Sequence, residues 1–435
     1  MSEPSALVIG SGGREHALAW ALERSGRFGR VYVAPGNAGT PDRVPVDLVE
    51  PGAARALVDF ARDRGVGLVV VGPEAPLAAG LADRLREAGL HVAGPSRGAA
   101  RIESSKAFAK QLMERAGVPT APFRLFADPQ RALAYVRRLE EPVVIKADGL
   151  AGGKGVVVCD SPRLAAEAVE ALMVRRVLGD AGRVVVVERR LTGRELSVMV
   201  VTDGERCVAL PPARDYKRLL DGDRGPNTGG MGSVAPVDVE AEAGLSLEAI
   251  LERIVHPTLR ALAAGGTPFR GVLYAGLMLT EQGPAVLEFN CRPGDPETQA
   301  QLPLVDPSRL ADALMAAAGV PGYGLPDDPR WLWRPSGPTE RAPGHAVCVV
   351  LASAGYPERP RTGDVIEQGL RDDETTLVFH AATRLGPDGR LETAGGRVLD
   401  VVGLGRDREE ARQRAYAAAA AIRFEGMQCR TDIGR

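Results

Sequence analysis

Lysine and asparagine are scarce in this chain of 435 residues. Only five of its 54 basic residues are lysines, and it has only three asparagines. Because arginine supplies nearly all the positive charge, a retained lysine indicates a position where a compact, flexible ammonium group is needed. Four lysines are therefore candidate ligand-binding residues. The fifth, Lys110, is expected on a plain helix surface.

Other absences each argue against a class of protein. The five cysteines form no CxxC pair, which argues against zinc and is typical of reduced cytoplasmic thiols. No apolar run approaches the roughly 20 residues of a membrane span, and no signal peptide is visible. With 54 basic and 56 acidic residues the net charge is −2, which argues against nucleic acid as a partner. The sequence thus indicates a cytoplasmic protein without a membrane or nucleic-acid role.

Apolar strands and amphipathic helices alternate over the first hundred residues. Strands are expected at 7–10, 31–34 and 68–72, and helices at 15–25, 53–64 and 77–88. This alternation predicts a doubly wound parallel sheet, in which ligands bind beyond the carboxyl ends of the strands. Glycine-rich loops leave those ends, so backbone N–H groups can approach an anion there.

The rest of the chain divides at changes of composition. We expect a Rossmann-like substrate domain over 1–103, a central region over 104–325, a proline-rich linker over 326–344, and a C-terminal domain over 345–435. The last of these should contain three strands and one alanine-rich helix.

Residues 10–16 (GSGGREH) do not fit a dinucleotide-binding loop. The third glycine of GxGxxG would fall at Glu15, and no carboxylate follows the second strand to hold a ribose. A nicotinamide enzyme is therefore improbable. Two interpretations stay open: a phosphate loop with Arg14 at the helix start, and a plain strand-to-helix turn.

Residues 146–156 (KADGLAGGKGV) do not fit a P-loop either. The first glycine of GxxxxGK[ST] would fall at Asp148, and Gly155 follows Lys154 where Ser or Thr is required. The pattern instead predicts a β-hairpin whose flexible glycine tip could fold over a polyphosphate and bring Lys154 to it.

Residues 286–297 (VLEFNCRPGDPE) predict a metal site. On a strand, Glu288 and Asn290 point to one face, and a carboxylate beside an amide oxygen suits Mg²⁺. Arg292 follows and could neutralise a transferring phosphate. The alternative, an edge strand with its polar face in water, is weaker because both flanks are apolar.

Residues 214–218 (RDYKR) and 225–232 (GPNTGGMG) would by default form a solvated loop. They nevertheless contain Lys217, the last lysine of the chain, and one of the three asparagines. Lys217, Asp215 and glycine N–H groups could hold a small substrate that has a carboxylate and an amine end.

Nine motifs, in order along nearly the whole chain, resemble the glycinamide ribonucleotide synthetase family of ATP-grasp ligases. They occupy residues 12–19, 34–40, 71–77, 145–151, 225–232, 288–292, 294–298, 362–366 and 429–434. The resemblance implies an α/β fold with an N-terminal doubly wound parallel-sheet domain, central ATP-grasp domains with a mobile lid over about 123–190, and a small C-terminal α+β domain.

The resemblance also implies the reaction. Glycine's carboxylate attacks the γ-phosphate of ATP, the co-substrate, to give glycyl phosphate and ADP. The amine of 5-phosphoribosylamine then displaces phosphate, which yields glycinamide ribonucleotide in purine biosynthesis. Mg²⁺, with Mn²⁺ as an alternative, is the implied cofactor, and the protein is expected to be a cytoplasmic monomer.

The resemblance assigns roles to individual residues. The implied ATP-binding residues are Lys106, Lys146, Gly152, Gly153, Lys154, Gly155, Glu188, Leu191 and Glu195. Glu288 and Asn290 would hold the metal, and Arg292 and Lys154 would be catalytic. The implied substrate residues are Gly12, Gly13, Arg14, Asn37, Gly39, Thr40, Glu74, Asp215, Lys217, Thr228, Gly229, Gly230 and Asp295.

The sequence departs from the family pattern in a few places. Arg189 stands where a second glutamate is usual, Pro293 replaces a phenylalanine, and Gly153 replaces an alanine. The strand at 273–278 lacks the upstream metal carboxylate of many ATP-grasp enzymes, so either water fills that position or only one firm Mg²⁺ site exists.

Two rival classes are another ATP-grasp enzyme, such as a carboxylase or formate-using transferase, and a non-catalytic nucleotide-binding module. The loops at 37–40 and 225–232 argue against the first rival. Arg292 and the glycine loops of the first domain argue against the second.

Overall fold

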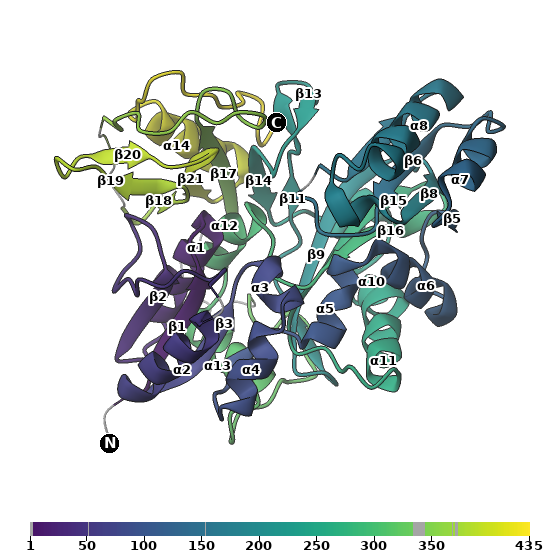
Figure 1. The fold of residues 1–435 in the computed structure, drawn as a ribbon. Helices are drawn as coiled ribbons and strands as arrows, with labels where there is room; N and C mark the ends of the chain where they lie inside the picture. The colour runs from purple at the N-terminus through teal and green to yellow at the C-terminus, as the bar shows by residue number, and fades with distance from the viewer. Residues whose placement is uncertain (1–2, 51, 153, 334–343, 368, 370–372) are drawn as a thin grey trace.

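The computed structural model describes residues 3–50, 52–152, 154–333, 344–367, 369 and 373–435. Its first sheet is parallel, with the strand order β2-β1-β3-β4, as the alternating pattern predicts. The strands are β1 (Ser5–Gly10), β2 (Arg30–Pro35), β3 (Val66–Val71) and β4 (Val92–Ala93). Helices α1 (Gly13–Glu23) and α2 (Ala53–Asp63) connect the first three strands, so two loops open at the carboxyl ends of β1 and β2 (Figure 1).

The single helix expected at 77–88 is instead two helices, so that prediction is wrong. They are α3 (Glu74–Ala78) and α4 (Leu81–Glu87). Gly80 separates them with a φ of +80°, a left-handed conformation that a glycine adopts without steric cost. As a result α3 begins directly after β3 and places Glu74 near the carboxyl edge of the sheet.

Residues 123–189 form a separate antiparallel sheet with the order β5-β8-β6-β7. Its elements are β5 (Phe123–Phe126), α7 (Pro129–Val136), β6 (Val143–Ala147), β7 (Val156–Cys159), α8 (Pro162–Val169), the π-helix η1 (Glu170–Val174), the 3₁₀-helix η2 (Gly179–Gly182) and β8 (Val185–Arg189). A hydrophobic cluster drawn from this segment alone packs it, including Ile145, Val169 and Val187. Figure 1 shows α7 and α8 far from the N-terminal strands.

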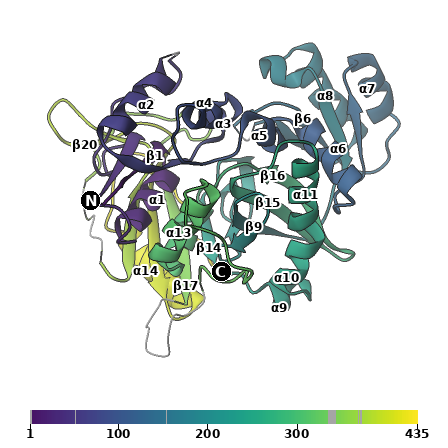
Figure 2. The same cartoon turned by 90° about the horizontal axis from the view of Figure 1, so that it is seen from below.

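A second antiparallel sheet, β10-β9-β15-β16, lies at the centre. Its strands are β9 (Arg194–Thr202), β10 (Cys207–Ala209), β15 (Gly271–Thr280) and β16 (Gly283–Asn290). The helices of this region are α5 (Arg97–Ser104), α6 (Lys106–Ala116), α9 (Val239–Ala243), α10 (Leu247–Ile250), the π-helix η3 (Leu251–Val255), α11 (His256–Ala264), α12 (Glu297–Gln301), the 3₁₀-helix η4 (Leu302–Leu304) and α13 (Pro307–Ala317). Figure 2 shows α6, α10 and α11 on the side of this sheet away from α1.

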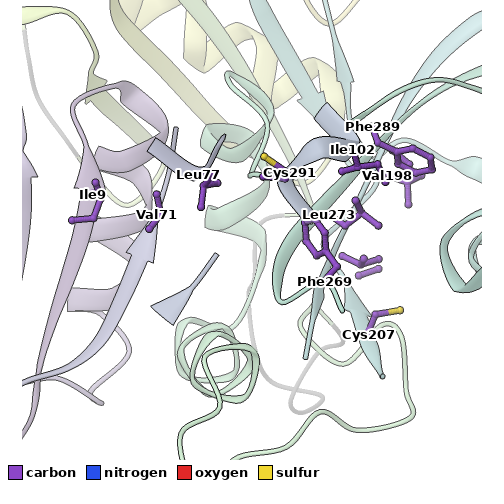
Figure 3. Close-up of a cluster of buried hydrophobic side chains, with 14 of the residues drawn as sticks. Ile9, Val71, Leu77, Ile102, Val198, Cys207, Phe269, Leu273, Phe289 and Cys291 are labelled. Carbon is purple, nitrogen blue, oxygen red and sulfur yellow. The ribbon is translucent and has the colours of Figure 1, made fainter. Parts of the chain in front are cut away.

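One hydrophobic cluster joins the N-terminal and central sheets. It includes Ile9 and Val71 from the parallel sheet and Leu273 and Phe289 from the central one, all at most 2% exposed. Leu77 of α3 lies between these groups in Figure 3. The two sheets therefore form one packed body in which β16 runs towards the carboxyl edge of β1 and β3.

The C-terminal sheet has the order β11-β14-β17-β21-β18. Its strands are β11 (Arg214–Asp215), β14 (Gly232–Ala235), β17 (His345–Ala352), β18 (Thr376–His380) and β21 (Arg397–Gly405), and α14 (Arg408–Ala419) packs on β17 and β21. Two hairpins were not expected from the sequence: β12 (Arg218–Leu220) with β13 (Arg224–Asn227), and β19 (Thr383–Leu385) with β20 (Leu391–Thr393).

Residues 334–343 of the expected proline-rich linker lie outside the described residues. None of the helices that the structure describes combines the length and the apolar character needed to cross a bilayer.

Candidate active site

Strand β16 ends in the residues expected to handle the metal and the transferring phosphate. Glu288 and Asn290 are two positions apart on the strand, so their side chains share a face. Burial alone would raise the pKa of Glu288, but Lys217, with further lysines and Arg292, holds it below its usual value. Asn290 Oδ1 accepts a hydrogen bond from Arg292 Nη2 at 3.3 Å. The carboxylate therefore stays ionised beside an amide oxygen.

This pair fits a divalent cation that arrives with a nucleotide. Among the described residues no cluster of three or more His, Cys, Asp or Glu side chains could hold a metal by itself. Mg²⁺ is commonly bound through one or two protein oxygens, while substrate phosphates and water complete its shell. In the ladder, Glu288 lies opposite Gly276 of β15, so that neighbour adds no carboxylate.

Arg292 connects this strand to the N-terminal domain. Its Nε lies 3.1 Å from Glu74 Oε2 at the start of α3, and its Nη2 lies 3.2 Å from Glu103 Oε1 on α5. Burial would lower the pKa of the guanidinium, but Glu103 and Glu74 raise it above its usual value. The arginine is thus a fixed positive charge at the end of β16.

A buried cluster of three charges joins residues 123–189 to α6. Glu188 on β8 lies 2.7 Å from Lys146 Nζ on β6 and 2.5 Å from Lys110 Nζ on α6. All three side chains are at most 6% exposed. Lys146 also donates to the Leu287 carbonyl at 2.8 Å, next to Glu288. The cluster therefore fixes Lys146 beside Glu288 and Asn290.

The expectation that Lys110 lies on a plain helix surface is wrong. Its Nζ donates to Thr120 Oγ1 at 2.6 Å, and that hydroxyl donates to the Val286 carbonyl at 2.7 Å. Burial lowers the pKa of Lys110 to about 8, against the opposing charge of Glu188. The scarcity of lysine was a signal in the sequence, but the helix pattern could not indicate the partner, because Glu188 is distant along the chain.

Lys106, the first residue of α6, is half-buried. Its backbone N–H donates to the Asp148 carbonyl at 3.1 Å. The Asp148 side chain in turn accepts from Ser105 Oγ at 2.9 Å and from the Ala107 N–H at 2.7 Å. These contacts tie the start of α6 to the loop that follows Lys146.

Glu195 of β9 in the central sheet forms a second charged cluster with Asp215 of β11 and Lys217, which follows β11. Lys217 Nζ lies 2.5 Å from Glu195 Oε2. Burial raises the pKa of Asp215 to about 8, although Lys217 opposes it. For Lys217, burial acts to lower the pKa, but Asp215 and Glu195 raise it well above its usual value. Glu195, which was predicted to bind ATP, thus lies beside Asp215 and Lys217, which were predicted to bind a substrate.

The tip of the β6–β7 loop faces the 225–232 loop. Gly152 and Lys154 line a cavity of about 350 Å³ whose other walls are Val156, Asn227, Thr228, Gly229, Tyr356, Pro357 and Arg397. Gly155 is buried and its carbonyl accepts from the Ala147 N–H at 2.8 Å. Leu191 lies half-buried just after β8. Gly153 lies outside the described residues.

An open cleft of about 780 Å³ lies at the carboxyl ends of β1 and β2. Of the predicted substrate residues, Gly12, Arg14, Asn37 and Asp295 line it. Burial opposes ionisation of Asp295, but Arg397 and Arg14 hold its pKa below the usual value. Arg14 Nη1 donates to the Pro293 carbonyl at 3.2 Å. The cleft therefore adjoins the segment that follows β16.

Other predicted substrate residues shape the loops of this cleft and are not among its lining residues. Gly13 allows close packing, since a Cβ there would lie 1.8 Å from Asp400 Oδ2. Gly39 donates to Asn37 Oδ1 at 2.9 Å, and Thr40 Oγ1 accepts from the Asn37 N–H at 2.9 Å. Asn37 Nδ2 is also engaged, by the Ser11 and His380 carbonyls. Asn37 thus holds the loop through all its side-chain polar atoms.

The sequence gave no indication of four residues around these cavities. Arg43 and Arg384 line the large cleft. Tyr356 Oη accepts from the Gly229 N–H at 2.9 Å, and Arg397 donates to the Gly229 carbonyl at 2.6 Å. Arg397 also lies 2.6 Å from Asp295 Oδ2. Three of these are arginines, which no pattern distinguishes among the 49 arginines of the chain.

A parallel N-terminal sheet combined with two antiparallel sheets is also found in solved structures. The biotin carboxylase domain of 2-oxoglutarate carboxylase from Hydrogenobacter thermophilus matches with a TM-score of 0.70 and 17% identity, over 99% of this chain and 92% of that chain. That likeness shows the fold alone. The ATP-grasp (A) domain model of a ligase family matches residues 104–298, which contain the charged residues of β6, β8 and β16, and so defines the class: an ATP-grasp ligase.

The chain belongs to the phosphoribosylglycinamide synthetase family. Its N, ATP-grasp (A) and C domain models match residues 5–103, 104–298 and 346–435. Phosphoribosylamine–glycine ligase from Rhodopirellula baltica is 46% identical over 442 residues, covering 100% of this chain and 98% of that protein. The Escherichia coli K12 ligase is 45% identical over 433 residues, covering 98% and 97%. The crystal structure of the Thermotoga maritima ligase matches with a TM-score of 0.82 and 36% identity, over 98% and 99%. The resemblance stated from the motifs is therefore confirmed.

Proposed function

We propose that the ATP-dependent ligation of glycine to 5-phosphoribosylamine, the activity of this family, passes through glycyl phosphate in the site described above. A glycine carboxylate oxygen attacks the γ-phosphorus and ADP leaves. The substrate amine then attacks the acyl carbon, phosphate leaves, and the amine gives up a proton. No side-chain nucleophile is required, so the residues act by positioning and by neutralising charge.

One observation carries this proposal: the segment after β16 runs from the nucleotide side of the site into the large cleft. Asn290 and Arg292 lie in mutual contact, and Arg292 also reaches Glu74. Asp295, three residues further on, lines the cleft. Glycyl phosphate formed beside Arg292 would therefore lie next to a substrate held in the cleft.

The nucleotide side is assigned by charge. Lys106 and Lys146 hold the α- and β-phosphates, and Glu188 orients Lys146 through their 2.7 Å ion pair. Glu288 and Asn290 hold a divalent cation, Mg²⁺ or Mn²⁺, which when bound would neutralise the phosphate oxygens. Arg292 faces the γ-phosphoryl group. The adenosine would lie along the hinge at Glu188, Leu191 and Glu195.

The substrate side is divided between two loops. The large cleft, which is lined by Arg14, Arg43 and Arg384, takes the phosphoribosyl group. Lys217 and Asp215 take glycine: Lys217 matches its carboxylate, and its ammonium would favour the ionised form of Asp215, whose pKa burial raises. Thr228, Gly229 and Gly230 shape the loop around it, because their N–H groups donate within the protein.

We also retain the domain division made from the sequence, with residues 123–190 as a lid that closes over ATP. Their separate hydrophobic core supports this division. The proposal further includes a monomer that works in the cytoplasm. The five cysteines of the chain are free thiols, and four of them are buried, as expected in a reducing compartment.

An assay of ADP release, in which glycine is replaced by other candidate substrates, tests the proposed function. Sustained ADP release should require both glycine and 5-phosphoribosylamine, and neither bicarbonate nor formate should replace glycine. ADP release with bicarbonate or formate would instead support a different ATP-grasp enzyme.

Replacing Lys154 by alanine should lower kcat by roughly 10- to 100-fold, because a charge-assisted contact to phosphate is lost. The side chain is exposed at the lid tip, so the melting temperature should hardly change. Steady-state kinetics with thermal unfolding measures both, and Arg175→Ala, another exposed cation of this region, is the control. A large drop in melting temperature with normal activity per folded molecule would contradict the assignment.

Replacing Arg43 by alanine should raise the KM for 5-phosphoribosylamine roughly tenfold or more, while the KM for ATP stays nearly constant. Arg14→Ala and Asn37→Ala should act in the same direction. Asn37→Ala should also lower stability, because its amide holds the Ser11 and His380 carbonyls. Arg55→Ala, an exposed arginine of α2, is the control. A defect in the KM for ATP alone would refute the division between cleft and lid.

A further inference from the structure

The motif at residues 429–434 has no role in the chemistry above. Residues 430–434, called the RTDIG segment here, lie against the β12–β13 hairpin, where Figure 1 marks the C-terminus beside β13. Arg430 is the largest of the fully buried side chains, at 1% exposure. A buried arginine is costly unless its donors are satisfied, so its partners indicate what it is for.

Two of the four hydrogen bonds that the Arg430 side chain donates go to the hairpin. Its Nη1 donates to the Arg218 carbonyl at 3.1 Å and to Asp223 Oδ1 at 2.8 Å. Its Nε and Nη2 each lie 2.7 Å from an oxygen of Asp432. The guanidinium carbon lies 5.1 Å from the centre of the Tyr216 ring, a cation–π distance.

Neighbouring residues of the segment hold the turn of the same hairpin. The Thr431 N–H donates to Asp221 Oδ1 at 2.8 Å, and Asp432 Oδ2 accepts from the Gly222 N–H at 2.8 Å. The Gly434 N–H donates to Tyr216 Oη at 3.1 Å. The segment thus touches both strand β12 and the turn at 221–223.

The far side of the segment is anchored to the C-terminal domain. Tyr416 Oη on α14 donates to the Arg430 carbonyl at 2.9 Å and accepts from the Ile433 N–H at 3.1 Å. Ile433 is fully buried and approaches Gly232, where a Cβ would lie 2.9 Å from it. The segment is therefore a rigid bridge from α14 to the hairpin.

The hairpin needs such support. Strands β12 and β13 form a sheet of only two strands, and every residue of β13 is exposed. An isolated two-stranded hairpin is at best marginally stable in water. Yet it leads directly into Thr228, which donates from its backbone N–H and from Oγ1 to the Lys217 carbonyl at 2.8 and 2.9 Å.

We propose that the RTDIG segment is a positioning element that holds the loop from Asp215 to Gly230 in its glycine-binding geometry. Arg430 acts through Tyr216, which lies between Asp215 and Lys217 in the chain, and through the hairpin turn. This inference rests on the proposed assignment of glycine to that loop. None of the residues of the segment lines either of the two cavities described above, so Arg430 is a positioning residue.

Variants of the full-length protein test the inference. Arg430→Met removes the buried charge. Asp223→Ala removes the exposed partner on the hairpin and leaves Arg430 paired with Asp432; since Asp223 has a φ of +53°, which alanine disfavours, Asp223→Asn is measured beside it to remove the charge without that strain. All three should speed amide hydrogen exchange over residues 218–228. The KM for glycine should rise roughly tenfold or more for Arg430→Met and about two- to fivefold for Asp223→Ala. The KM values for ATP and 5-phosphoribosylamine should change less than twofold.

Asp388→Ala is the matched control, since Asp388 also pairs with an arginine, Arg390, at 2.6 Å in an exposed turn. It should change neither exchange over 218–228 nor any KM. If Asp223→Ala leaves exchange in the hairpin unchanged, the segment does not hold it and the inference is overturned, even if Arg430→Met fails to fold. If exchange rises but only the KM for 5-phosphoribosylamine responds, the positioning role stands and the glycine assignment is wrong.

Discussion

Replacing Glu288 by glutamine should lower kcat by about 10²- to 10³-fold, the usual loss when a preorganised electrostatic group is removed. Glutamine keeps the shape of the side chain but removes its negative charge. In this protein that charge is held ionised by Lys217, Arg292 and further lysines. The concentration of Mg²⁺ that gives half-maximal activity should rise as well, because one of two protein oxygens loses its charge.

A titration of activity against Mg²⁺ and then Mn²⁺ measures both effects. Glu281→Gln is the control, because Glu281 is an exposed glutamate in the turn that joins β15 to β16. It should leave kcat and the metal requirement unchanged. If Glu288→Gln also retains its wild-type metal requirement, the metal does not bind at Glu288 and Asn290.

Replacing Lys146 by methionine should weaken ATP binding roughly 10- to 100-fold and lower kcat as well, since a charge-assisted contact to phosphate is lost. Methionine preserves most of the apolar stem. Glu188 retains Lys110 at 2.5 Å, so it is not left as an unpaired buried charge. The loss of activity should therefore exceed what any loss of folded protein explains.

Nucleotide binding by calorimetry, with thermal unfolding of the same samples, separates the two effects. Arg163→Gln on α8 is the control, because it removes a cation of the same domain from an exposed ion pair with Glu167. A Lys146→Met protein that binds ATP with wild-type affinity would refute the assignment of this lysine to the phosphates.

The order of the elements could be predicted because it depends on local patterns. The alternation of apolar strands and amphipathic helices gave the parallel sheet, and the two-residue period of β16 placed Glu288 and Asn290 on one face. The break at Gly80 was missed, because the apolar periodicity continues through it. The β19–β20 hairpin was missed because its strands are only three residues each.

The charged contacts of the site could not be predicted, because they join residues that are distant in sequence. Lys110 has the spacing of a helix-surface residue, and only the folded chain brings Glu188 to it. In the same way, nothing near Arg384 or Arg397 indicates that Arg384 lines the cleft of the first domain or that Arg397 pairs with Asp295 of the central region. Motifs therefore predict where the chemistry takes place, whereas the contacts that support those residues required the structure.

The central claim is that the glycine carboxylate is activated by transfer of the γ-phosphoryl group of ATP. Glycine labelled with ¹⁸O at both carboxylate oxygens tests it directly, by mass spectrometry of the products of a complete reaction. The account predicts one ¹⁸O in the released phosphate, one in the amide of the product, and none in ADP. Phosphate without label, or label found in AMP, would contradict it.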